Sequence, residues 1–286
     1  MTHYSINQFS KITGINKILI RTWENRYNFI KPKRTSTNIR VYDQNMLNLG
    51  IKYGILVDSG HKISNLVKYD QDYINSLIEH TLETTDNIEN QNRIYISKFV
   101  ESAILFNQDL FEKTYNTCIN KLGFINFYKN ILIKTMSKIS ILFLKSEIDP
   151  SHEHFLSENI RLKLSSEIEK IENPISENRW VLFLPENEYH DIGLLFTYFI
   201  LKKKKQRVIY LGQNVPRESL LQFNNSNLLF FLNANKSKDY TEKLCSYLNF
   251  KTKNCHIYLI ERTKANDKIY SNITKISDID KFIDLI

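Results

Sequence analysis

The spacing of apolar residues changes along the chain. Over 5–27 and 71–172 apolar residues recur every three or four positions, which predicts amphipathic helices. From Trp180 onward they form short continuous runs separated by helix-length segments, as is typical of buried strands in a doubly wound parallel sheet. These runs read WVLFLP, RVIYLG, NLLFFLN and HIYLIE. The pattern therefore predicts a multidomain chain that is helical first and α/β at its end.

The first helical stretch has the layout of a helix-turn-helix. Ser5 is a candidate N-cap, Thr13-Gly14 is a candidate turn, and a second helix is predicted to begin near Asn16. Three apolar residues are expected on the inward face of this second helix: Ile15, Ile18 and Leu19. Its basic residues then project outward, as in a helix that lies in the major groove of DNA. They are Lys17, Arg21 and Arg26.

A basic segment, KPKRTSTNIRVYD, follows and is predicted to form a hairpin. Arg40 and Tyr42 alternate with apolar residues there, so a guanidinium and a phenol share one strand face, which suits them to binding phosphates. Arg34 lies on the same segment and is a further DNA-binding candidate. We expect Glu24 to pair with a neighbouring arginine, because an exposed carboxylate would repel phosphate.

The positive charge of the chain is concentrated in this region. The whole chain has a formal net charge of +8, and residues 1–70 hold 11 Lys and Arg against four Asp and Glu, a net +7. Localised positive charge indicates a polyanion-binding module joined to a nearly neutral remainder. The alternative is that these cations are ordinary solvated residues on a small helical domain.

Residues 4–66 resemble the winged helix-turn-helix of the mercury-resistance regulator (MerR) family. The resemblance rests on RTWENRY at Arg21 to Tyr27, on the wing NIRVY, and on the LVDSGHKISNL segment that follows. It implies that a domain over 1–72 binds double-stranded promoter DNA. Homodimers or larger homo-oligomers are expected, because paired half-sites add affinity.

The middle of the chain predicts a second domain. Its last four helices are expected to close an antiparallel bundle over 88–172. The short connections are predicted at Asn107-Gln108, Gly123 and Asp149-Pro150. A polar linker with Pro174 then leads to an α/β domain over 178–286.

The loop PENEYHDIG, Pro185 to Gly193, directly follows the first predicted strand. Ligands of doubly wound sheets lie beyond the carboxyl ends of the strands, so His190 stands where such a domain binds its ligand. A metal-ligating histidine is commonly oriented by a carboxylate on its other ring nitrogen, and Glu188 precedes it by two residues. Gly193 would let a bulky planar ligand approach the helix start. A structural or surface histidine is the alternative.

This loop resembles that of cobalamin-binding domains, in which the histidine is the lower ligand of cobalt. Val208 to Pro216 resembles the second strand and turn of the same flavodoxin-like fold, and the domain order is that of the adenosylcobalamin-dependent photoreceptor repressors of carotenoid genes. The resemblance implies adenosylcobalamin as cofactor and His190 as the ligand of its cobalt. The other implied cofactor-binding residues are Glu188, Gly193, Gly212, Phe143, Glu153 and His154.

Several positions depart from that family. Phe143 stands where the family has tryptophan, and Leu144 stands where its light-responsive members have a second histidine. Asn233-Ala234 and Glu261-Arg262 replace the small hydroxyl residue and the paired glycines of the nucleotide-tail pocket. The domain therefore binds cobalamin, another ligand or none. His152 either faces a cofactor or lies on a half-buried helix face.

The remaining features set the class of protein. Three scattered cysteines without CxxC spacing indicate buried free thiols. No apolar run approaches the roughly 20 residues of a membrane span, and no signal core is present, so we expect a cytoplasmic protein. Without a catalytic triad, P-loop or GxGxxG motif, an enzyme is not expected. We expect a transcription regulator, a repressor with a sensor domain; the alternatives are a cobalamin-carrying module of a methyltransferase or mutase system, and a regulator whose sensor no longer binds cobalamin.

Overall fold

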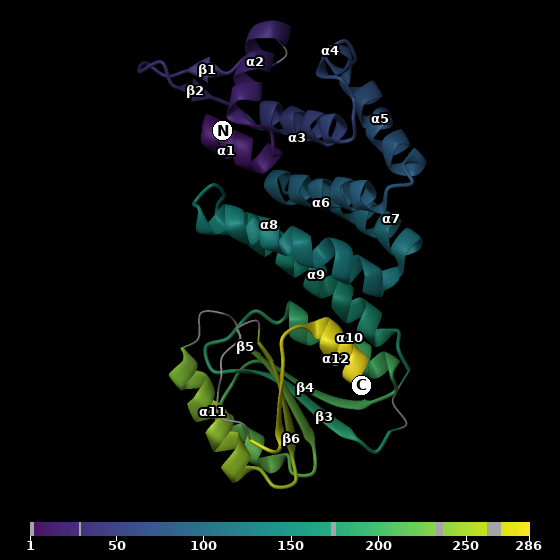
Figure 1. Cartoon of the computed structure of the whole chain (residues 1–286), viewed down its shortest axis with the longest axis vertical. Coiled ribbons are helices and arrows are strands. Elements are labelled where there is room, and N and C mark those ends of the chain that lie inside the picture. The colour runs from purple at the N-terminus through teal and green to yellow at the C-terminus, as the bar shows by residue number, and fades with distance from the viewer. Residues whose placement is uncertain (1–2, 29, 173–175, 233–236, 262–269) are drawn as a thin grey trace. The chain divides into compact units, whose positions relative to one another are not determined.

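The computed structural model describes residues 3–28, 30–172, 176–232, 237–261 and 270–286. The chain divides into two units, Met1–Ser157 and Glu158–Ile286, and the division falls within α9 (Pro150–Glu169). Unit 1 is built of helices with one short hairpin, and unit 2 is a parallel sheet flanked by helices (Figure 1). The predicted fold class is confirmed.

Unit 1 begins with the predicted helix-turn-helix, formed by α1 (Ile6–Thr13) and α2 (Lys17–Tyr27). A capping box starts α1: the Ser5 hydroxyl accepts from the backbone amide of Gln8, and the Gln8 side chain accepts from the backbone amide of Ser5. Gly14 ends α1 with a φ of 82°, a left-handed conformation that favours glycine. Asn16 caps α2, at the predicted position.

The inward face of α2 differs from the prediction. Ile20 and Trp23 are buried, whereas Ile18 is 71% exposed and Leu19 is 46% exposed. The buried residues stand three positions apart and share one helix face, and a residue two positions from Ile20 lies on the opposite side. Of the three residues expected inside, only Ile15, which precedes the helix, is buried.

A two-stranded antiparallel hairpin follows α2 and forms the wing. Its strands are β1 (Lys33–Arg34) and β2 (Arg40–Val41). Just after β2, Tyr42 bridges to Tyr4, and each backbone amide donates to the carbonyl of the other residue. The ring of Tyr42 also packs against Phe9 of α1, with 4.5 Å between the ring centroids. The wing is therefore fixed to the first helix by backbone and side chain together.

The rest of unit 1 is a stack of helices. α3 (Gln44–Asp58) contacts both α1 and α6, and Gly50 allows the close approach of α1, because a Cβ there would clash with the Phe9 ring. The predicted connections of the bundle are confirmed: Asn107 caps α7, Gly123 breaks it with a φ of 71°, and Pro150 opens α9. The remaining elements are α4 (Ile63–Leu66), α5 (Gln71–Thr84), α6 (Ile88–Leu105), α7 (Gln108–Phe127), the π-helix η1 (Tyr128–Leu132) and α8 (Ile133–Leu144).

Unit 2 contains a five-stranded parallel sheet in the order β4-β3-β5-β6-β7. The chain moves outward from β3 in both directions, so the switch point of this sheet lies at the carboxyl ends of β3 and β5. The strands are β3 (Arg179–Pro185), β4 (Arg207–Val215), β5 (Asn227–Leu232), β6 (His256–Glu261) and β7 (Ile273–Ile276). The helices are α10 (Ile192–Lys203), η2 (Arg217–Gln222), α11 (Lys238–Lys251) and α12 (Ile279–Leu285).

Both faces of this sheet are covered (Figure 1). α11 packs on one face, where Leu248 joins the core of Phe183 and Phe230. α10 and α12 lie on the other face, where the ring of Trp180 is 5.6 Å from that of Phe282. This two-sided burial explains why the strands appear in the sequence as continuous apolar runs.

Two further predictions concern the whole chain. Cys118, Cys245 and Cys255 are buried thiols that form no disulfide within the described residues, as predicted. Across the described residues, none of the helices has the length and apolar content that crossing a bilayer requires.

Candidate functional site

The unburied face of α2 carries the predicted cations. Lys17, Arg21 and Arg26 are exposed there, and Arg34 is exposed on the wing. The guanidinium of Arg34 donates across the wing turn to the side-chain oxygen of Asn38, with 2.9 Å between Nη1 and Oδ1. Together with the exposed Ile18 and Leu19, this surface offers both charged and apolar groups, the two kinds that phosphates and base edges bind.

Glu24 joins α2 to the wing. Its Oε2 accepts from Nε of Arg40 at 2.7 Å, and its Oε1 accepts from the hydroxyl of Tyr42. The Glu24 side chain is only 8% exposed, so this carboxylate is a buried anchor. The expectation that Glu24 pairs with a neighbouring arginine is confirmed. The anchor holds the Arg40 guanidinium at the base of the wing.

Tyr42 is not placed as the strand pattern predicts. Its side chain has no exposed surface, and burial together with the hydrogen bond to Glu24 raises the pKa of its phenol. The phenol therefore points into the helix-turn-helix core, away from any phosphate. β2 is only two residues long, so alternation does not determine which side is buried. The bridge to Tyr4 turns the ring inward.

The loop after β3 brings Glu188 and His190 together, as predicted. Nδ1 of His190 lies 2.6 Å from Oε1 of Glu188, and the same oxygen accepts from the backbone amides of Tyr189 at 3.0 Å and His190 at 3.1 Å. Glu188 is 5% exposed, whereas the imidazole of His190 is 73% exposed. Burial alone would raise the pKa of Glu188, but these hydrogen bonds outweigh it and lower that pKa to about 2. A buried anion thus orients an exposed imidazole.

The end of β4 holds the same loop from the side. The backbone amide of Asn187 donates to Oδ1 of Asn214 at 2.9 Å, and the backbone amide of Asn214 donates to the carbonyl of Glu188 at 3.2 Å. Nε2 of Gln213 donates to the carbonyl of Tyr189 at 2.8 Å. Sequence reasoning missed these contacts. The sequence held one signal for them, an asparagine at both 187 and 214. Both residues adopt a positive φ, which asparagine tolerates better than most residues.

Asp191 extends the arrangement to α9. Its Oδ1 accepts from Nη2 of Arg161 at 2.9 Å and from Nε at 3.2 Å, and its Oδ2 accepts from the hydroxyl of Tyr210 at 3.4 Å. Asp191 is buried, and the Tyr210 ring stacks on Tyr198 with 5.4 Å between centroids. The residue after His190 is therefore tied to a helix thirty positions earlier, a pairing with no sequence signal.

Gly193 and Gly212 stand in different surroundings. The space where Gly193 would carry a Cβ is bordered by the Phe231 ring, whose nearest carbon lies 3.1 Å away. The open approach expected at this helix start is therefore filled by an aromatic side chain from β5. Gly212 has a φ of 78° and lies where the pairing of β3 with β4 shifts register. Its role in the structure is conformational.

The other predicted cofactor residues belong to α8 and α9. Phe143 is 40% exposed at the end of α8, and Leu144 is 77% exposed beside it. Glu153 and His154 stand on the first turns of α9, with 3.6 Å between the carboxylate Oε2 and the imidazole Nδ1. The His154 side chain is 70% exposed. Contact of these residues with a cofactor stays a prediction.

His152, the alternative candidate, is a core residue of the bundle. Its Nδ1 lies 3.1 Å from the carbonyl oxygen of Ala103, so this nitrogen carries the proton and donates. The ring stacks on Phe106 with 4.5 Å between centroids. His152 is therefore buried more deeply than the half-buried helix face that was one of its two predicted placements. Asn233, Ala234 and Arg262, which bear on the nucleotide-tail prediction, lie outside the described residues.

Known proteins match both the N-terminal segment and most of the length of this chain. The family described as MerR HTH family regulatory protein matches residues 4–71. The HTH-type transcriptional repressor CarH of Myxococcus xanthus is 25% identical over 223 residues, which cover 76% of this chain and 73% of that protein. The HTH-type transcriptional repressor CarA of the same organism is 21% identical over 216 residues, covering 75% of this chain and 70% of that protein.

A solved structure resembles this chain in fold. The Methanosarcina barkeri monomethylamine corrinoid protein superposes with a TM-score of 0.53 at 15% sequence identity, covering 67% of this chain and 94% of that one. A helical domain followed by a parallel α/β sheet is thus an arrangement that a corrinoid protein also uses. The N-terminal winged helix is therefore a MerR-type helix-turn-helix domain, the chain is homologous to the CarH and CarA repressors, and it shares its fold with a corrinoid protein.

Proposed function

We propose that this chain is a transcriptional repressor that binds promoter DNA through α2 and the wing, and that senses a corrinoid, adenosylcobalamin, through His190. The observation that carries the sensor half is the buried Glu188 carboxylate fixed to Nδ1 of an exposed histidine at the switch point of the sheet. The proposal that the chain is a repressor is supported by its similarity to CarH and CarA, which are both HTH-type transcriptional repressors.

The donor set fits a cobalt corrinoid. A hydrogen bond from Nδ1 to a carboxylate selects the tautomer in which Nε2 carries the lone pair, and neutral imidazole nitrogen is a good ligand for transition metals. Glu188 stays ionised down to a pH of about 2, so this orientation persists through the physiological range. The Phe231 ring beside Gly193 narrows the site at the start of α10.

Four residues of unit 2 have separate roles in the proposed site. His190 binds the cobalt, Glu188 fixes the imidazole, and the contacts of Gln213 and Asn214 hold the loop in place. When bound, adenosylcobalamin supplies a cobalt–carbon bond that light can cleave. Asp191 and Arg161 connect the loop to α9, so a shift of the loop would be felt by that helix. Phe143, Glu153 and His154 are proposed to contact the cofactor.

Corrinoid retention tests the sensor half. The full-length protein is mixed in the dark with adenosylcobalamin or hydroxocobalamin, passed through gel filtration, and its visible spectrum is recorded. We expect the corrinoid to co-elute, His190→Ala to abolish retention, and Glu188→Gln to weaken retention by about 10- to 100-fold, because an orienting partner is lost. His80→Ala, at an exposed histidine of α5, is the matched control and should retain corrinoid.

A second variant tests the narrowed space. Phe231→Ala removes the ring next to Gly193, so it should increase corrinoid affinity if the cofactor extends toward this helix start. Wild-type protein that retains no corrinoid at micromolar concentration, with Phe231→Ala equally inactive, would overturn the sensor proposal. The DNA-binding proposal would then stand by itself.

Gel shifts on promoter fragments from the host genome test the DNA half. Arg34→Ala removes an exposed wing cation, so it should weaken binding to every sequence and flatten the salt dependence by about one unit. Arg21→Ala should instead reduce the preference for the operator over random duplex. Lys253→Ala, an exposed cation of unit 2, is the control. A chain that prefers no promoter fragment is not a regulator, and the alternative of a cobalamin-carrying module would gain weight.

A further inference from the structure

A cleft in unit 1 is lined by cations but has apolar walls. Its volume is about 450 Å³, within the size range of small-molecule sites. One side is formed by α8 together with Lys145 directly after it, and the other by Lys11 of α1. The lining residues are Lys11, Ile133, Lys134, Ser137, Lys138, Ile141, Leu142 and Lys145. Four of these eight residues are lysines and none is acidic.

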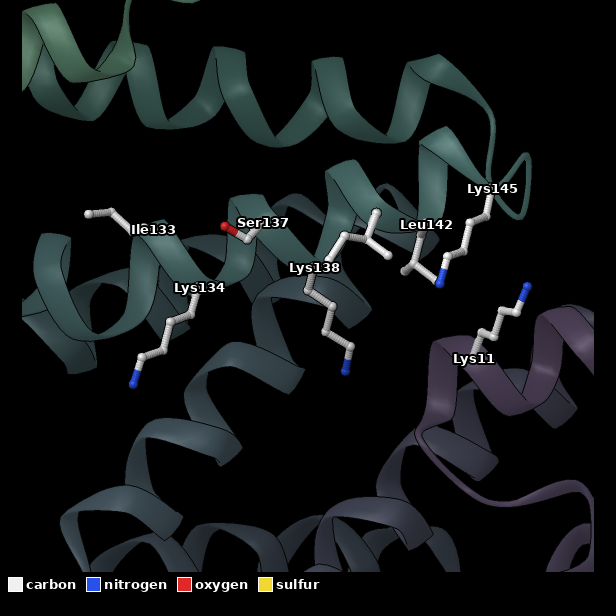
Figure 2. A pocket seen from close by; sticks show the side chains of 8 residues that line it. Lys11, Ile133, Lys134, Ser137, Lys138, Leu142 and Lys145 are labelled. Carbon is white, nitrogen blue, oxygen red and sulfur yellow. The ribbon is translucent and has the colours of Figure 1, made fainter. Parts of the chain in front are cut away.

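Two of these lysines lie on the same side of α8. Lys134 and Lys138 stand four positions apart on α8, so their side chains leave the helix on the same side. Figure 2 shows both extending from α8, with the ammonium groups of Lys145 and Lys11 facing one another farther along the cleft. Lys11 is paired with Glu147. Within the described residues, no ion pair or hydrogen bond forms to the ammonium of Lys134, Lys138 or Lys145.

Two observations indicate that this cleft is incomplete without an anion. Lys138 is half-buried, and burial lowers its pKa even though Asp58 acts in the opposite direction, so its charge is poorly compensated. Ile141 is 51% exposed on the same wall. Exposure of its apolar side chain to water is unfavourable, so a ligand that covered this side chain would gain binding free energy. An occupant with an anionic group and an apolar body would satisfy both.

We propose that this cleft is an effector site for a small amphipathic organic anion, with one acidic group and an apolar body. A nucleic acid is the less suitable occupant, because backbone phosphates bind exposed cations, whereas this cavity is concave and its walls are largely aliphatic. The site touches α1 of the helix-turn-helix and α8 of the bundle at once. An occupant therefore binds best at one spacing of these helices, and it biases DNA binding through that preference.

Fluorescence titration of the full-length protein tests the proposal. The probe is 1-anilinonaphthalene-8-sulfonate, and its neutral analogue N-phenyl-1-naphthylamine reports apolar contact without charge. Lys134→Gln/Lys138→Gln should weaken sulfonate binding by at least about tenfold and leave the neutral analogue unchanged, because only charge-assisted contacts are lost. The matched control Lys251→Gln/Lys253→Gln removes two exposed lysines of unit 2 and should bind both probes as the wild type does.

Two further measurements identify the chemical class of the ligand. Ile141→Ala shortens an apolar wall without changing charge, so it should weaken both probes. Decanoate should displace the sulfonate from wild-type protein, whereas sedimentation with phosphatidylglycerol vesicles should be unchanged by the lysine substitutions. Sulfonate binding that the lysine variant leaves intact would overturn the proposal. Vesicle binding that depends on these lysines would also overturn it. So would a lysine variant that, with no anion added, binds promoter DNA more weakly and with a smaller salt dependence than the wild type.

Discussion

Two buried glutamates, one in each unit, each position one basic side chain, and they do so differently. Glu24 connects α2 to Arg40 on β2 and to Tyr42 just after β2, which lie 16 and 18 positions later in the chain. The Glu188 carboxylate accepts within its own loop, from the next two residues along the chain. The Arg40 side chain is 21% exposed, whereas that of His190 is 73% exposed.

The difference separates folding from ligand binding. A carboxylate that joins two elements contributes to the stability of the domain, because removing it leaves buried donors on both elements unpaired. A carboxylate that orients one exposed ring contributes chiefly to the geometry of a site. The winged helix is therefore expected to be sensitive to its anchor in stability as well as in DNA affinity. The sensor loop should be sensitive mainly in ligand affinity.

The largest effect is expected at Glu24. Glu24→Ala leaves the phenol of Tyr42 buried without its acceptor and releases Arg40, so the free energy of unfolding should fall by about 3 kcal/mol. Urea unfolding monitored by circular dichroism measures this loss. Glu89→Ala removes an exposed carboxylate from the pair with Arg93, and this control should change stability by less than about 0.5 kcal/mol. Equal losses in the two variants would show that Glu24 is no anchor.

The same contrast, between contacts within one loop and contacts between elements, explains which contacts could be predicted from the sequence. Local spacing places His190 two residues after Glu188 on one loop, and the structure has that contact. The strand runs and helix connections are also local, and they were predicted correctly. The burial of Tyr42 depends on Tyr4, 38 positions away, and the pairing of Asp191 depends on Arg161. Such contacts between elements leave no periodic trace.

Ambiguous periodicity accounts for the error in α2. Apolar residues occur at 15, 18, 19, 20 and 23, and more than one helix face can be drawn through them. The face that contains Ile20 and Trp23 is chosen by packing in the helix-turn-helix core. Phe231 illustrates another limit, because nothing in its strand indicates that the ring covers Gly193 of a different element. Tertiary packing decides such choices.

A third buried carboxylate sharpens the comparison, because no hydrogen bond or ion pair forms to it among the residues that the structure describes. Glu101 on α6 is 6% exposed, and burial raises its pKa to about 7 against the opposing effect of Lys52 and Lys98. The folded state then binds a proton that the unfolded state has lost, so destabilisation develops as pH rises from about 4.5 to 7 and is complete above 7. Glu101→Gln should stabilise the protein by about 2 kcal/mol at pH 8.

The pH dependence of that gain is the check. Calorimetric melting temperatures at pH 8 and pH 4.5 should differ between Glu101→Gln and wild type only at the higher pH. A gain of equal size at both pH values would indicate improved packing in place of a relieved charge. A loss at pH 8 would show that the ionised carboxylate is stabilising.

Glu188 should show the opposite dependence. Its folded pKa of about 2 is below the unfolded value, so its contribution is present above pH 4.5 and is lost as pH falls toward 2. Glu188→Gln should lower the stability of unit 2 by about 1 to 2 kcal/mol at pH 7, because a satisfied buried anion is replaced by a poorer acceptor. The difference from wild type should shrink as the pH is lowered through this window. A difference that stays constant from pH 7 to pH 3 would contradict the assignment.

The smallest change in stability is expected at His190, where the change in ligand binding is the largest. In His190→Ala the Glu188 carboxylate keeps its two backbone donors, and the lost ring was 73% exposed. The free energy of unfolding without corrinoid should therefore fall by less than about 1 kcal/mol. The melting temperature of wild-type protein should rise when corrinoid is added, since a ligand that binds only the folded state stabilises it, and that rise should be absent in the variant. A loss above about 2 kcal/mol without ligand would mark His190 as a structural residue, and the division between the two anchors would not hold.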